Sequence, residues 1–254
     1  MLLAFTSRAE VAKPFPAHWG EPPKIETRDY KPLPGGYGFG SSTLANWIKE
    51  NMAEDAASGG ASPARPLYSC DFSELPEGLV PDSFMVIQGE FEVKTDGTNK
   101  LLELPGAPLD SHSVLFGPVT NANVAVEVRI YSTSKGRRMP AFGVGLGGVA
   151  GYKLQIAPAK GTAELLLDTL VVASVPYDWK SGVWTQCKLQ IRKTGEAAWT
   201  VEAKAWPAGS AEPSTWLLTK ETHEAPINGQ ASVLGSPFSG KPIQYDDLWV
   251  VAAK

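Results

Sequence analysis

The chain is poor in cysteine and histidine, with two Cys and three His among 254 residues. The histidines stand at positions 18, 112 and 223, and their surroundings match none of the Cys/His spacings of zinc sites. A zinc site of the motif type is therefore excluded. The sequence also lacks any run close to the roughly 18 apolar residues that a membrane-spanning helix needs, so we expect no membrane span.

Positive charge is scarce as well. The formal net charge is −4, and the 23 Lys and Arg residues form no basic stripe, since the pair Arg137 and Arg138 is too small to make one. Nucleic-acid phosphates bind to basic surfaces. We therefore expect no nucleic-acid partner. The 43% hydrophobic content is that of a folded chain with a substantial core.

The first residues, MLLAFTSRA, hint at a secretory signal. Their apolar core, from Leu2 to Phe5, is shorter than the roughly seven to 15 residues of such signals, and no basic residue precedes it. They indicate at most a truncated remnant. We nevertheless expect an extracytoplasmic location: the periplasm, the cell surface or the exterior of the cell.

The two cysteines, Cys70 and Cys187, fall on expected inward positions of strands. Free buried thiols are one interpretation, because unpaired cysteine is among the most buried residue types. A single disulfide is the alternative, and it would favour an oxidising compartment.

Residues 1–66 are rich in proline and glycine and predict an irregular N-terminal arm. One amphipathic helix is expected within it, at about 42–56, where Leu44, Trp47, Ile48 and Met52 recur at helical spacing. An arm this rich in proline would not fold alone, so it would wrap its own domain or reach a neighbouring chain. A protein partner or self-association through residues 1–66 is therefore one hypothesis.

Beyond Pro66 the hydrophobic period changes to two. In the run 122–131, the side chains on one face are those of Val124, Val126, Val128 and Ile130. Glu127 and Arg129 point to the other face, which is the pattern of a half-buried strand. The alternation recurs in the run 183–191, and turn signals such as TDGTN and APAKG separate many such runs. Residues 67–254 are thus predicted to form an all-β, antiparallel two-sheet sandwich.

The segment GVGLGG, which includes Gly143 and Gly145, has the glycine spacing of the dinucleotide-binding fingerprint. That fingerprint requires a helix immediately afterwards, whereas the following GYKLQI is typical of a strand. We interpret the segment as a glycine-rich strand that bends or lets another group approach.

The sequence offers no clear pair of catalytic acids. Retaining glycosidases need two carboxyl groups roughly 5 Å apart, and no run of the E-x-D-x-x-E kind occurs here. Glu127, Asp168 and Asp178 are conceivable acids with no assigned role.

Tryptophan is the more suggestive residue type. Trp179 and Trp184 flank the turn in YDWKSGVW, and Trp206 lies on a later expected strand. Sugars present apolar C–H faces that stack on aromatic rings, so exposed tryptophans on a sandwich are typical of a glycan platform, although core packing explains them as well. With Glu127 and Arg129, these three are the candidate ligand-binding residues.

Four segments carry a resemblance to a known family: YSCDFSELPEG, GYKLQI, SGVWTQCKLQIRK and YDDLWVVA. From Tyr68 onward the chain resembles the bacterial 3-keto-disaccharide hydrolase family and, more broadly, the concanavalin A-like lectin/glucanase (laminin G-like) group. The resemblance implies a jelly roll in which the closing strand lies beside the opening one and a concave sheet faces ligands. The chain has AFGVGLGGVA where family members carry an N-S-G-like segment and an arginine, which argues against hydrolase activity.

The resemblance also implies one metal to test. Jelly rolls often tie their opening and closing strands with a calcium ion, and Asp71, Asp246 and Asp247 would supply the oxygens. Hydrogen bonding at turns and strand ends is the alternative role for these aspartates. We expect no other cofactor.

Three functions are therefore considered. The first is a non-catalytic carbohydrate-binding sandwich, the second a glycoside hydrolase acting on 3-keto-disaccharides, and the third a structural or assembly subunit that uses the N-terminal arm.

Overall fold

The computed structural model describes residues 66–78 and 80–253, and all the regular structure within them is β-strand. Eight strands form sheet A. In order across the sheet they are β13 (Leu218–Thr222), β12 (Ala198–Pro207), β11 (Thr185–Gly195), β6 (Val124–Ser132), β15 (Ile243–Ala252), β4 (Asn99–Leu104) and β3 (Glu92–Asp96), with β1 (Tyr68–Cys70) also paired to β15.

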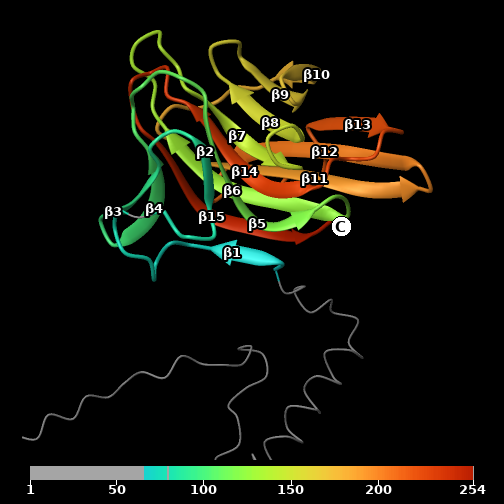
Figure 1. Cartoon of the computed structure of the whole chain (residues 1–254). Helices are drawn as coiled ribbons and strands as arrows, with labels where there is room; N and C mark the ends of the chain where they lie inside the picture. The colour runs from blue at the N-terminus through green and yellow to red at the C-terminus, as the bar shows by residue number, and fades with distance from the viewer. Residues whose placement is uncertain (1–65, 79, 254) are drawn as a thin grey trace, which may run out of the picture. The chain divides into compact units, whose positions relative to one another are not determined.

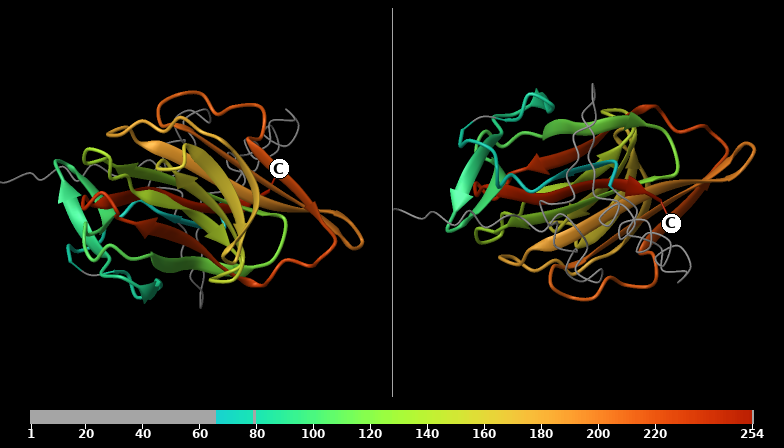
Figure 2. Two further views of the ribbon diagram at one scale, coloured as in Figure 1. Left: turned by 90° about the horizontal axis from the view of Figure 1, so that it is seen from above. Right: turned by 90° about the horizontal axis from the view of Figure 1, so that it is seen from below.

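Seven strands form sheet B. In order they are β10 (Leu170–Pro176), β9 (Thr162–Leu167), β8 (Tyr152–Ala157), β7 (Ala141–Leu146), β14 (Gly229–Ser236), β5 (His112–Thr120) and β2 (Met85–Gln88). The two sheets lie face to face as layers (Figure 1 and Figure 2). Neighbouring strands in both are antiparallel, which confirms the predicted sandwich for residues 66–78 and 80–253.

The core lies between the sheets and is built from alternate side chains. On β6, Val126, Val128 and Ile130 are each 0% exposed, whereas Glu127 and Arg129 on the opposite face form ion pairs. The alternation read from the sequence is confirmed for this strand. Burial of one face of every central strand fixes its register, because a one-residue slip would turn the apolar side chains to solvent.

The opening and closing strands are neighbours, as the resemblance implied. Cys70 on β1 pairs with Leu248 on β15. A bulge interrupts β15 between Asp246 and Trp249, where Asp247 has a φ of 51°. This extra residue lets two consecutive aspartates turn toward the same neighbouring strand.

The glycine-rich segment forms β7 and leads directly into strand β8, so the dinucleotide-binding reading is correctly excluded. A Cβ atom at Gly143 would overlap the backbone carbonyl of Leu154 on β8. Glycine is therefore required here for the close approach of two strands.

Two further predictions from the sequence concern the cysteines and the N-terminal arm. Both cysteines are free: Cys187 is fully buried and Cys70 half-buried. The helix expected at 42–56 and the arm of residues 1–66 lie outside the described residues, apart from Pro66. Within the part that the structure describes, no helix is long and apolar enough to cross a membrane.

One side chain links the two sheets through a hydrogen bond. Tyr245 on β15 is 0% exposed, and its hydroxyl group donates to the carbonyl oxygen of Leu234 on β14, at 3.0 Å. The neighbouring Gly235 makes room for this hydroxyl, because a Cβ atom at that position would overlap it. The tyrosine and the glycine therefore depend on each other.

We predict that Gly235→Ala lowers the free energy of unfolding by about 3 kcal/mol, since the added methyl group overpacks the core. Tyr245→Phe should cost about 1 kcal/mol for the lost hydrogen bond. In the double variant, Gly235→Ala should lower the free energy of unfolding by clearly less than it does alone, because the hydroxyl group that the added Cβ atom would overlap is gone. Urea denaturation measures all three values.

A matched control is Gly209→Ala. An added Cβ there meets nothing within 4 Å, and only the positive φ of 88° opposes it, so we expect a cost of about 1 kcal/mol. Strictly additive effects of the changes at 235 and 245 would contradict the packing described.

Candidate functional site

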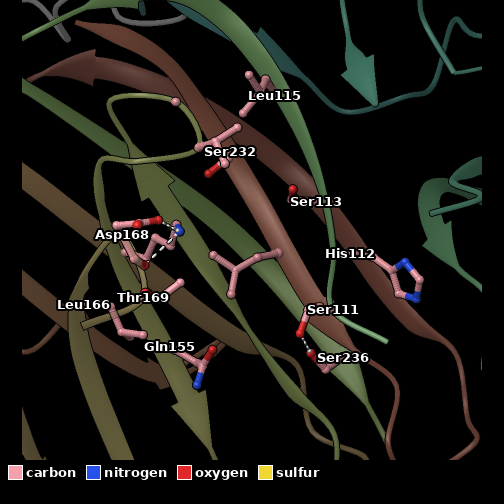
Figure 3. Close-up of a pocket in the computed structure, with 15 residues that line it drawn as sticks. Ser111, His112, Ser113, Leu115, Gln155, Leu166, Asp168, Thr169, Ser232 and Ser236 are labelled. Atoms are coloured by element: carbon pink, nitrogen blue, oxygen red, sulfur yellow. Dashed lines mark hydrogen bonds and ion pairs between the residues drawn. The ribbon is translucent and has the colours of Figure 1, made fainter. Parts of the chain in front are cut away.

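A hollow of about 240 Å³ opens on the outer face of sheet B. Its walls come from β5, β8, β9 and β14 and from the turns that follow β7 and β9 (Figure 3). We call it the sheet B hollow. Its volume lies just below the roughly 300–1,000 Å³ of pockets for drug-sized ligands, so it suits one small ring or one unit of a longer chain.

The hollow follows from the register of five neighbouring strands. One row across the sheet consists of Leu166, Lys153, Gly145, Ser232 and Leu115. All of these except Gly145 line the hollow. The row places two polar side chains at its centre and a leucine at each end.

Gly145 is what lets the two polar side chains approach each other. A Cβ atom there would overlap the hydroxyl oxygen of Ser232 and would lie 3.3 Å from Cγ of Lys153. Because the glycine has no side chain, both neighbours lean over it from opposite sides. In the next row across the sheet, Gln155 lies beside Gly143 and adds another polar side chain to the wall that Lys153 forms.

Hydroxyl groups and one ion pair complete the lining. Ser111 and Ser236 are hydrogen-bonded through their hydroxyl oxygens at 3.0 Å. The ammonium group of Lys153 donates to the backbone carbonyl of Asp168 at 2.9 Å, and the Asp168 carboxylate lies 3.9 Å away (Figure 3). Burial lowers the pKa of Lys153, and the Asp168 charge only partly offsets this effect.

The predicted ligand-binding residues lie elsewhere. Arg129 and Trp184 come together on sheet A, where the guanidinium carbon lies 4.8 Å from the indole ring centre. The same guanidinium group binds Asp246 at 2.6 Å and approaches Asp247 at 3.1 Å. Tyr131 packs on the other side of this cluster, with its ring centre 5.4 Å from that of Trp184. The charged groups of this cluster thus form ion pairs with one another.

Glu127 and Trp206 belong to a second network on sheet A. Glu127 forms an ion pair with Lys188, which also binds Glu212 at 3.0 Å. Lys204 binds Glu212 at 2.8 Å and lies over the ring of Trp206, which is 8% exposed. Burial raises the pKa of Glu212, but the hydrogen bonds from Lys204 and Lys188 outweigh it and hold that pKa below its ordinary value.

Trp179 lies apart from the other candidates. Its ring packs edge-on against Phe142 of the core at 5.9 Å between centres, in the segment after β10. The neighbouring Asp178 forms an exposed ion pair with Lys180. The structure therefore sets Trp179 apart. Trp184 and Trp206 lie on the outer face of sheet A, where Arg129, Gln186 and Trp206 form one row and Trp184 stands two residues before Gln186. The role of all three tryptophans in binding stays a prediction.

The calcium hypothesis can be tested against the three aspartates. Asp71 accepts hydrogen bonds from the backbone NH group and the hydroxyl group of Ser73, as expected for a turn. Asp246 and Asp247 face the guanidinium group of Arg129 instead of a free cavity. Among residues 66–78 and 80–253, no group of three or more His, Cys, Asp or Glu side chains could hold a metal ion. This arrangement does not fit a calcium site, because arginine already supplies the positive charge.

Apart from Asp168, which the sequence analysis named as a conceivable acid, the residues of the sheet B hollow were missed in the sequence. Lys153 and Gln155 lie in the quoted segment GYKLQI, and Ser232 lies far along the chain. The usable signal was the pair of glycines at outward positions of β7, since two missing side chains on a central strand leave space on its surface.

We predict that Arg129→Met destabilises the fold by about 3 kcal/mol, because it leaves the Asp246 carboxylate, which is 1% exposed, without its cation. In an Asp246→Asn background the same change should cost much less. Arg138→Met, at an exposed position, serves as the control and should change the free energy of unfolding by less than about 0.5 kcal/mol. Equal costs in both backgrounds would show that the ion pair is unimportant.

Calcium should leave the thermal midpoint of the protein unchanged relative to a chelator, because a ligand stabilises only the state that binds it. A midpoint that rises with calcium concentration would show that the aspartates release Arg129 and take up the metal.

Solved structures show what this chain is similar to. The carbohydrate recognition domain of Emp47p matches with a TM-score of 0.50 at 11% identity, over 77% of this chain and 100% of that one. The potassium-bound form of the Emp46p carbohydrate recognition domain matches with a TM-score of 0.50 at 12% identity, over 75% and 99%. The carbohydrate-binding module CBM66 from Bacillus subtilis matches with a TM-score of 0.47 at 8% identity, over 67% and 96%.

No family model matches the chain, and none of the curated proteins does. At these identities the likeness shows the fold alone, a two-sheet β-sandwich of the concanavalin A-like kind.

Proposed function

We propose that this protein is a carbohydrate-binding sandwich and that the sheet B hollow receives one sugar unit. The observation that carries the proposal is the row in which Lys153 and Ser232 meet over Gly145 between two leucines. A sugar ring has polar hydroxyl edges and apolar C–H faces, and this row offers both kinds of surface within one small volume. The carbohydrate recognition domains that share the fold agree with the proposal without carrying it.

The lining of the hollow supports binding by a few polar groups in a mostly pre-formed site. Gln155 and Thr169 lie at its wall and make no side-chain hydrogen bond within the described residues. Their amide and hydroxyl groups are therefore free to bind a ligand. Leu115 and Leu166 provide the apolar contacts.

Binding is favoured over hydrolysis because the acids are dispersed. Asp168 is the one carboxylate among the described residues that line the hollow. Glu127 is paired with Lys188 on sheet A, and Asp178 is paired with Lys180 in a loop. A retaining mechanism needs a second carboxyl group roughly 5 Å from the first. Hydrolysis of 3-keto-disaccharides is therefore the weaker proposal. The third hypothesis, assembly through residues 1–66, stays a prediction, because that segment lies outside the described residues apart from Pro66.

We predict that Gln155→Ala weakens glycan binding about tenfold, since the loss of one hydrogen bond in a binding site is worth roughly 1.4 kcal/mol. The matched control is Gln186→Ala, because Gln186 is also a half-buried, outward-facing glutamine on a central strand, but of sheet A. A glycan array followed by titration calorimetry on the bound glycans measures both variants.

An equal loss of glycan affinity in the two variants would assign the site to neither sheet. A loss of affinity confined to Gln186→Ala would place the site on sheet A. If no glycan of a broad array binds the full chain, the carbohydrate proposal is wrong.

A further inference from the structure

Lys153 is the one lysine or arginine among the described residues that line the sheet B hollow. Its stem lies against Gly145, and its side chain is 18% exposed. A lysine in this position keeps its charged end inside the hollow instead of in open water.

The ammonium group of Lys153 is incompletely paired. It has three N–H donors, and among residues 66–78 and 80–253 only the backbone carbonyl of Asp168 accepts one of them at hydrogen-bond distance, 2.9 Å. The Asp168 carboxylate is 3.9 Å away and 58% exposed, so water screens much of its attraction. The lowered pKa of Lys153 has the same origin, since burial removes water that nothing in the chain fully replaces.

The cations of sheet A are paired differently. Several of them have a carboxylate at 3.0 Å or closer: Lys188 with Glu127 and Glu212, Arg192 with Glu202, and Lys204 with Glu212. Lys100 on β4 instead donates to the backbone carbonyl of Leu75 at 2.6 Å. Lys153 thus differs from Lys188, Arg192 and Lys204, because its nearest carboxylate lies 3.9 Å away.

The neutral groups around Lys153 can each donate a hydrogen bond. Ser232 is 3% exposed, and its hydroxyl group leans over Gly145 toward the same space. Thr169 and Gln155 add a hydroxyl group and an amide. A ligand oxygen that enters the hollow therefore meets one cation and several hydroxyl or amide groups, while the Asp168 carboxylate is 58% exposed to water. A ligand carboxylate can form a charge-assisted hydrogen bond with the unused donors of Lys153.

We propose that the sheet B hollow selects sugars that carry a carboxylate, the uronic acids, and that Lys153 binds this carboxylate. The inference rests on the proposed carbohydrate-binding function and adds the substrate class. A neutral sugar fills the same volume but supplies no counter-charge for the ammonium group, so it binds more weakly.

The test compares each acidic oligosaccharide with its methyl ester, which has the same ring and no charge. A panel of oligogalacturonate, oligoglucuronate and oligomannuronate, each with its ester, is titrated into the full chain. We expect at least one acid to bind ten or more times more tightly than its ester. Binding of that acid should weaken as the pH rises through the pKa of Lys153, which lies below that of an ordinary lysine.

Lys153→Met should abolish the difference between acid and ester, because the affinity for the acid falls to the level of the ester. Lys220→Met is the charge-matched control, because Lys220 is exposed on β13 of sheet A, and it should keep the difference. Circular dichroism confirms that both variants fold.

The outcomes separate the two proposals. Binding of neutral glycans with no preference for acids, or a preference that survives Lys153→Met, overturns the acidic-sugar inference and leaves carbohydrate binding in place. The absence of binding to every acidic and neutral glycan overturns both.

Discussion

The apolar layer between the two sheets decides where every other side chain of this sandwich can go. Residues such as Val126, Val144 and Leu154 are fully buried in that layer, and a strand that buries one residue must present the next one on the outer face. The packing of the core therefore determines which residues of each strand face outward. Where the core forces Gly145 outward on β7, the outer face of sheet B is left with a space that its neighbours border.

Ion pairs neutralise buried charges on both outer faces, including Glu164 of sheet B with Lys160 at 3.0 Å, and Lys153 differs from them. On sheet A, buried or half-buried charges neutralise one another, as Arg129 does with Asp246 and Lys188 with Glu127. Such pairs hold adjacent strands in register, but their hydrogen-bonding capacity is largely used within the chain. On sheet B, Lys153 keeps unused donors beside a hollow. This difference supports the proposal that a ligand binds on sheet B.

Much of the fold was predictable from the sequence because period-two burial is a local property. The run 122–131 identified β6 correctly, and GYKLQI after the glycines excluded a dinucleotide site. The hollow was not predictable in the same way, because it depends on which residue of β14 lies beside which residue of β7. Positions 145, 153 and 232 become neighbours only through strand pairing. Arg129 was rightly placed on the outward face of its strand, but its contacts with Trp184 and Asp246 depend on strand pairing and on the β15 bulge.

The most direct test of the central claim is an amide NMR map of the protein with a bound glycan. If the sheet B hollow is the binding site, the largest chemical-shift changes will fall on β7, β8 and β14, around Gly145, Lys153 and Ser232, while the amides of β11 and β12 stay unchanged. Changes centred on Lys188 and Trp206 of sheet A, with β7 and β8 unaffected, would contradict the account.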